Sequence, residues 1–132
     1  MRFIDTNIFI YTLTAHHTFG QTAKNILERL ENGEEAITST LVLCEIAWVL
    51  EAMGKQGSIE VTLEKILSYK TLKIVEITSD DLLIGANNMA TYGLDFNDGV
   101  NIALMMRMSI SEIYSNDQKH LGKIDFIKTI FA

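Results

Sequence analysis

Four acidic side chains of this sequence border apolar stretches, where a carboxylate is costly to bury. They are Asp5, Glu45, Asp98 and Asp117. A carboxylate held against apolar surface loses its hydration unless a cation or hydrogen-bond donors replace the water, and no Lys or Arg is adjacent to any of the four. One shared divalent metal ion would satisfy all four together.

The elements that must position these acids follow from hydrophobic periodicity and capping residues. The patterns predict strands over 2–5, 35–38, 73–77, 112–114 and 128–131, and helices over 21–30, 41–53, 58–69, from a cap at Thr78–Asp80 to about residue 91, and from about residue 97 onward. The helix over 41–53 is so apolar that it is expected to be largely buried. Ser39–Thr40 is its predicted N-terminal cap.

Short apolar strands that alternate with helices, without hairpin signals, predict an α/β fold with a parallel sheet. Helices would cover both faces of that sheet in a Rossmann-like three-layer arrangement, and residues 1–132 would form a single domain. In such a sheet the strands end, and the following helices begin, at one edge, which is where ligands bind. The four acids are therefore expected to converge at that edge.

Composition restricts the class of protein. With 48% hydrophobic and 21% charged residues the chain is globular, and its apolar stretches are too short to span a membrane. The single Cys44 cannot form an internal disulfide, so a reducing cytoplasm is the expected location. The net charge of −6 opposes binding to a polyanion, but clustered acids that hold divalent cations would reverse the local sign.

Four short motifs together resemble the PIN-domain family, particularly the VapC-type toxins. The motifs are Asp5-Thr6-Asn7 after an apolar strand, Ser39-Thr40 followed by Glu45, Asp98-Gly99-Val100-Asn101-Ile102-Ala103, and Ser115-Asn116-Asp117 after a late strand. The resemblance covers essentially the whole chain. It implies a metal-dependent endoribonuclease that pairs with a small antitoxin, with Asp5, Glu45, Asp98 and Asp117 as its acidic quartet. Gly99 replaces a frequent Ala of the family, and Ser115 a frequent Thr.

The chemistry of these residue types agrees with that implication. Hard oxygen ligands favour Mg²⁺ or Mn²⁺ and leave coordination positions for a phosphate oxygen and an attacking water. Asp5 and Asp117 are the expected direct ligands, while Glu45 and Asp98 complete the site directly or through water. Thr6, Ser115 and Asn116 are expected to orient the carboxylates or a substrate phosphate. RNA cleavage would leave 5′-phosphate and 3′-hydroxyl ends.

Several residues also have structural interpretations. Asp98 could pair with Asp95 in a capping arrangement, Asp117 could cap a following helix, and Asp5 could begin a turn. We assign Asp80, Asp81 and Asp95 to helix caps, and we expect His16, His17 and His120 to be exposed without a role as metal ligands. Nothing in the sequence predicts an aromatic platform for base stacking.

Three other functional classes remain open at this stage. A haloacid-dehalogenase-like phosphatase needs a second acid two residues after the first, but position 7 is Asn. A phosphoacceptor receiver domain needs an acceptor Asp after the third strand, where the sequence has Ile77-Thr78. A catalytically inactive binding module on the same fold would not need four converging acids.

The apolar surface predicts protein partners. The helix over 41–53, together with Phe9, Ile10, Tyr11 and Leu13 as exposed candidates, offers more hydrophobic surface than one small sheet requires. We expect a homodimer, and a hydrophobic groove that accepts an antitoxin peptide. Cys44 and Trp48 are expected to pack in the core or in an interface.

Overall fold

The computed structural model describes residues 1–132, which form a five-stranded, fully parallel sheet. The strands are β1 (Arg2–Ile4), β2 (Ala36–Ser39), β3 (Leu72–Val75), β4 (Glu112–Tyr114) and β5 (Lys128–Ile130), in the spatial order β3-β2-β1-β4-β5. Phe3 pairs with Ile37 on one side and with Ile113 on the other. The strand order therefore changes direction between β1 and β4, and the predicted parallel α/β sheet is confirmed.

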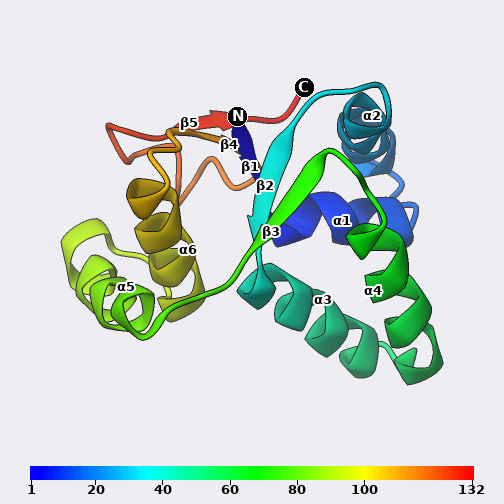
Figure 1. Cartoon of the computed structure of the whole chain (residues 1–132), viewed down its shortest axis with the longest axis horizontal. Coiled ribbons are helices and arrows are strands. Elements are labelled where there is room, and N and C mark those ends of the chain that lie inside the picture. Colours follow the sequence, from blue (N-terminus) through cyan, green and yellow to red (C-terminus); the bar gives the residue numbers. More distant parts are fainter.

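Six α-helices cover this sheet. They are α1 (Thr6–Leu13), α2 (Gly20–Glu31), α3 (Thr40–Ala52), α4 (Ile59–Leu67), α5 (Ser79–Tyr92) and α6 (Phe96–Arg107), with a short 3-10 helix, η1 (Gln56–Ser58), before α4. Figure 1 shows α5 and α6 on one side of the sheet and α1, α2 and α4 on the other, with α3 below the ends of β2 and β3. This is the expected three-layer arrangement. None of the helices combines the length and apolar character needed to cross a membrane.

Helix α1 was not predicted from the sequence. Its residues are apolar on every side and show no 3.6-residue period, but Asp5 caps it by accepting a hydrogen bond from the Thr6 amide. The expectation that Phe9 is exposed is wrong, because helix formation turns Phe9 into the core, where it is 2% exposed. Leu13, at the end of α1, is exposed as expected.

Helix α3 is less buried than expected. Only Val42, Ile46 and Leu50 are fully buried, whereas Cys44 and Trp48 are exposed. The helix packs mainly through one stripe; Leu43 beside it is partly buried against the core, and Cys44 and Trp48 face solvent. Core packing is therefore excluded for Cys44 and Trp48, which leaves an interface as the remaining interpretation.

Helices α5 and α6 pack unusually closely because glycines face each other. A Cβ atom added to Gly99 would collide with the backbone carbonyl oxygen of Gly85, and one added to Gly85 would lie 2.5 Å from a methyl group of Val100. The pair is also joined by Arg107, whose guanidinium donates two hydrogen bonds to the buried Asp81 carboxylate at 3.1 and 2.8 Å. This contact holds the pKa of Asp81 below its usual value. The α5–α6 unit thus forms a rigid support for the start of α6.

Candidate functional site

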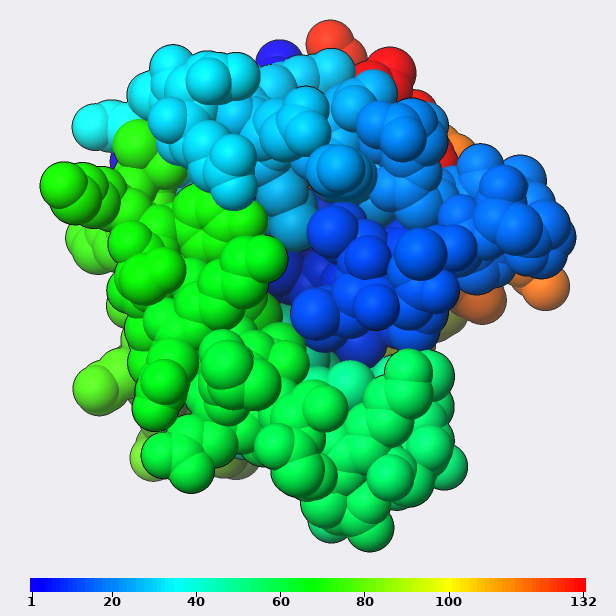
Figure 2. Space-filling view, turned by 90° about the vertical axis from the view of Figure 1, so that its right-hand side faces the viewer, coloured from blue at the N-terminus to red at the C-terminus, as the bar shows by residue number.

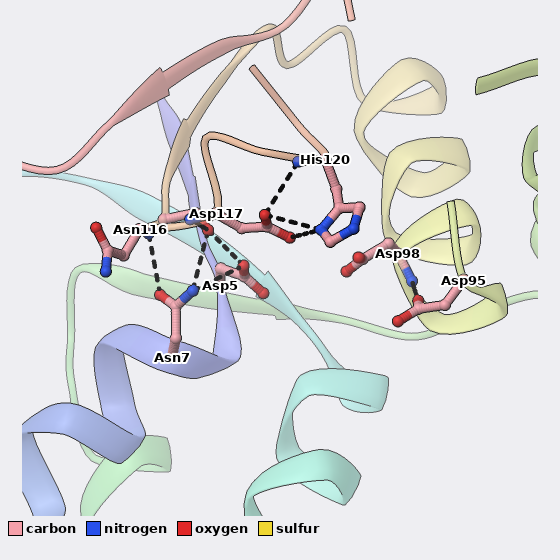
Figure 3. Close-up of polar contacts among 8 residues, drawn as sticks. Asp5, Asn7, Asp95, Asp98, Asn116, Asp117 and His120 are labelled. Carbon is pink, nitrogen blue, oxygen red and sulfur yellow. Dashed lines mark hydrogen bonds and ion pairs between the residues drawn. The ribbon is translucent and has the colours of Figure 1, made fainter. Parts of the chain in front are cut away.

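Asp5 lies at the end of β1, where the strand order changes direction. Its carboxylate accepts hydrogen bonds from the Thr6 amide at 2.8 Å and from the Ser115 hydroxyl at 2.6 Å. The Asn7 side-chain amide donates to the same Ser115 oxygen at 3.2 Å (Figure 3). Burial raises the pKa of Asp5, the two hydrogen bonds lower it, and the negative charge of Asp117 raises it further. Ser115 therefore links the ends of β1 and β4 through a hydroxyl that Thr would also supply.

Asp117 follows β4 across the same edge of the sheet. Its backbone amide donates to the Ser115 hydroxyl at 3.1 Å, which joins it to the Asp5 cluster. Its carboxylate oxygens lie 3.1 and 3.2 Å from Nδ1 of His120, and one of them also accepts the His120 backbone amide. No helix follows Asp117, so the interpretation of this residue as a helix cap is wrong; the segment forms turns instead.

Asp98 lies in the first turn of α6 and has a carboxylate without a hydrogen-bond partner. The backbone amide of Asp98 donates to the capping Asp95 side chain at 2.8 Å, but the reciprocal bond that would complete a capping box is absent. Burial, and then the charges of Asp5, Asp95, Asp117 and Glu45, raise the pKa of Asp98 to about 8. The side chains of all four predicted acids therefore act electrostatically on one region.

Glu45 reaches this region from α3. Ser39, the predicted cap of that helix, accepts the Val42 amide at 3.0 Å and donates its hydroxyl proton to the buried Asn101 side chain of α6 at 2.6 Å. Glu45 accepts a hydrogen bond from the Thr6 hydroxyl at 2.8 Å. Burial raises its pKa, and the charge of Asp5 adds to that effect. Thr6 thus contacts two of the four acids, one through its amide and one through its hydroxyl.

Sequence reasoning missed three members of the site. Asp95 caps α6 as predicted, but its charge also raises the pKa of Asp5, Glu45 and Asp98. Its place directly before the first residue of α6 gave only the signal of a cap. Asn7 belongs to the first motif, but the sequence did not predict its contact with Ser115. His120 is half-exposed, and in the view of Figure 3 its imidazole lies between Asp117 and Asp98.

Asn116 does not orient the carboxylates through its side chain, and its contact with a substrate phosphate stays a prediction. Its side chain makes no hydrogen bond to the acids, and in Figure 3 it points away from Asp5. Its backbone amide instead donates to the Asn7 side chain at 3.3 Å. The residue therefore contributes to the site through the course of the backbone.

The donor chemistry of the site suits a hard divalent cation. Every carboxylate of the cluster offers oxygen ligands, and the pKa of about 8 for Asp98 records negative charge that a cation would offset. In the structure no three carboxylate, thiolate or imidazole groups already lie close enough to share one ion. Asp5 is held by Ser115, and Asp117 by His120.

Comparison with known families decides which proteins this arrangement belongs with. The sequence pattern of the PIN domain matches residues 2–127, which is nearly the entire chain. The chain belongs to the PIN domain family. Curated protein sequences give no significant match to it.

Solved structures share this PIN fold at low sequence identity. VapC20 of Mycobacterium tuberculosis, described as a sarcin-ricin loop cleaving toxin, is 19% identical with a TM-score of 0.77, and the match covers 91% of this chain and 92% of that one. The Rickettsia felis VapBC2 complex bound to a promoter DNA fragment gives 19% identity and a TM-score of 0.73 over 98% and 96%. FitAcB of Neisseria gonorrhoeae gives 16% and 0.68 over 98% and 96%. At these identities the similarity establishes the fold.

Proposed function

We propose that this PIN domain is a metal-dependent endoribonuclease and the toxin of a toxin–antitoxin pair. The observation that carries the proposal is that Asp5, Glu45 and Asp117 converge from separate elements on the start of α6, where burial first, and then their charges together with that of Asp95, raise the pKa of Asp98 to about 8. Crowded like charges destabilise a fold, so a site that retains them is best explained by a cation that they bind. The VapC and VapBC structures that share the fold support the same class of function.

In this proposal Asp5 and Asp117 hold the metal ion directly, and Glu45 and Asp98 complete the site. When bound, Mg²⁺ or Mn²⁺ would lower the pKa of an attacking water and offset charge on the phosphate. Ser115 and Thr6 fix the Asp5 carboxylate, while His120 fixes that of Asp117. These contacts keep oxygen ligands directed at the edge where a phosphodiester would bind, and cleavage leaves 5′-phosphate and 3′-hydroxyl ends.

The test is cleavage of a short single-stranded RNA by purified protein with and without Mn²⁺. The wild type should cleave in Mn²⁺, stop in EDTA and recover when Mn²⁺ is restored. Asp5→Asn should fold normally and lose at least about a hundredfold in kcat, because Asn keeps the shape and removes the charge that holds the cation. Asp125→Asn, an exposed substitution with the same change in charge, is the matched control. Cleavage that is insensitive to EDTA, or products with 2′,3′-cyclic phosphate ends, would contradict the mechanism.

The phosphatase alternative is tested in the same experiment with a phosphate monoester. Position 7 is Asn, and its amide donates to Ser115, so it supplies a hydrogen-bond donor where that mechanism requires an acid. Hydrolysis of the monoester without cleavage of RNA would favour the phosphatase. Absence of both activities, with Mn²⁺ binding retained, would favour an inactive binding module.

An antitoxin partner is part of this proposal. Helices α1, α2 and α4 meet around a small, largely apolar pocket of about 50 Å³, which Leu13, Leu27, Ile66 and Tyr69 help to line (Figure 2). An apolar side chain of a partner peptide could fill it, with Lys65 at its margin available to an acidic group. The VapBC2 complex with the same fold supports this class of partner. A cytoplasmic location and a homodimer complete the proposal.

A further inference from the structure

Five aromatic rings from distant parts of the sequence gather at the far end of α1. Three of them, Phe19, His16 and His17, are nearly parallel and form what we call the ring ladder. The centroids of Phe19 and His16 are 5.0 Å apart with planes 16° from parallel, and those of His16 and His17 are 4.9 Å apart at 15°. These values are those of stacked rings. The sequence did not predict an aromatic platform, and the fold creates one.

The ladder is held in place from within. Nδ1 of His16 accepts the backbone amides of Thr18 and Phe19, each at 3.1 Å, which fixes the orientation of this ring. The ring of Tyr11 packs against His16 and Phe19 at 5.0 and 5.2 Å between centroids. Among the aromatic rings His17 contacts only His16, and His17 is exposed. One end of a preorganised stack therefore faces solvent.

The ladder is connected to the acidic site by two elements. Tyr11 lies six residues after Asp5, and a helix rises about 1.5 Å per residue, so the two are roughly 9 Å apart along α1. Phe131, whose ring packs edge-on against Phe19 at 5.8 Å, directly follows Ile130, and the carbonyl of Ile130 accepts the backbone amide of Ser115. Helix α1 and the segment after β5 therefore join the ring ladder to the elements that carry the acidic site.

A polar hollow lies beside the ladder. It has a volume of about 530 Å³ and is lined by His16 and His17 together with Gln21 and Lys24 of α2. The loop that carries the ladder projects at the right-hand edge of the face drawn in Figure 2. A ring face for a base and an ammonium group for a phosphate are the two contacts that proteins use to bind single-stranded nucleic acid without reading its sequence.

We propose that the ring ladder is a stacking site for one base of the single-stranded RNA substrate, with the base on the outer face of His17 and its phosphate near Lys24. This inference rests on the proposed nuclease function and adds a binding site outside the acidic cluster. Base stacking on an aromatic side chain is a large and sequence-tolerant contribution, so loss of the His17 ring should weaken RNA binding about tenfold. The stacked ring has no chemical step to perform, so kcat should stay unchanged.

The test measures binding of a short fluorescent single-stranded RNA to the full chain by anisotropy in EDTA, and kcat and KM for its cleavage in Mn²⁺. His17→Ala should raise Kd and KM about tenfold. His17→Phe, which keeps a ring and removes the imidazole nitrogens, should stay within about twofold of the wild type. Thr18→Ala, which changes the neighbouring exposed side chain and leaves its backbone amide on His16, is the matched control.

Two further comparisons make the result decisive. The first comparison uses a series of RNAs, each with one abasic nucleotide at a different position. At a single position the missing base should weaken binding to the wild type but not weaken binding to His17→Ala any further, because the variant already lacks the ring on which that base stacks. An unchanged Kd for His17→Ala would overturn the proposal, as would full rescue by His17→Lys without rescue by His17→Phe, because attraction would then come from charge. Binding that depends on the His17 ring in a protein that cleaves no RNA would support the stacking site and refute the nuclease. Cleavage of RNA by His17→Ala with an unchanged KM would support the nuclease and refute the stacking site.

Discussion

Replacing Asp98 by Asn should stabilise the metal-free protein. The folded-state pKa of about 8 lies well above the value of about 3.9 for an unfolded chain, so the folded state binds more protons between these two values. Stability contributed by this raised pKa is fully present below about pH 4 and is lost as the pH rises to 8. Neutral pH lies about 3 units above the pKa of this carboxyl in the unfolded chain. At pH 7 Asp98 therefore lowers the free energy of unfolding by about 4 kcal/mol.

Asn is neutral and nearly the same size, so Asp98→Asn removes this penalty without opening a cavity. Rotation of the neighbouring carboxylates and entry of water already relieve part of it in the wild type, and we expect a gain of about 2 kcal/mol. For a domain of this size that gain corresponds to a rise in Tm of roughly 6–10 °C. The gain in EDTA would then measure the combined cost of burying the Asp98 carboxylate and of the negative charges around it.

The assay is urea unfolding in EDTA between about pH 5 and 9. The free energy of unfolding should fall with pH more steeply in the wild type than in Asp98→Asn, and Asp125→Asn should follow the wild type. Saturating Mn²⁺ should raise the stability of the wild type more than that of Asp98→Asn, because binding to the folded state stabilises by mass action. Equal stabilities and equal pH slopes in EDTA for the wild type and Asp98→Asn would refute the electrostatic reasoning.

Three shorter predictions follow from other contacts. Gly99→Ala should lower the free energy of unfolding in urea by about 1–3 kcal/mol because its Cβ meets the α5 backbone. Gly57→Ala, where the added Cβ meets open space, should be nearly neutral, and equal effects of the two substitutions would contradict the close α5–α6 packing. His120→Ala should weaken Mn²⁺ binding about tenfold by calorimetry, since it releases the Asp117 carboxylate, and an unchanged Kd would remove the orienting role. Light scattering at micromolar concentration should give twice the 14.9 kDa chain mass, and Trp48→Glu should give the monomer; a monomeric wild type would exclude the homodimer.

Most of the fold could be predicted because it is encoded in local patterns. The period of the apolar residues defines α2. Helix α5 follows from its predicted cap at Thr78, which forms a complete capping box with Asp81. Alternation of strands and helices was sufficient to predict a parallel sheet. Helix α1 was missed because it is apolar on every side, and a helix that is buried on several faces has no amphipathic period to detect.

The sequence by itself determined which carboxylates are costly to bury. Each of the four, Asp5, Glu45, Asp98 and Asp117, borders apolar residues within a few positions along the chain. Only the tertiary structure decided what surrounds them. Asp95 acts on the site as a charge as well as a cap, and His17 stacks on His16 at the open end of a ring ladder. Coulomb interactions and ring stacking depend on separation in space, which the sequence leaves open until the strands pair and bring their ends to one edge.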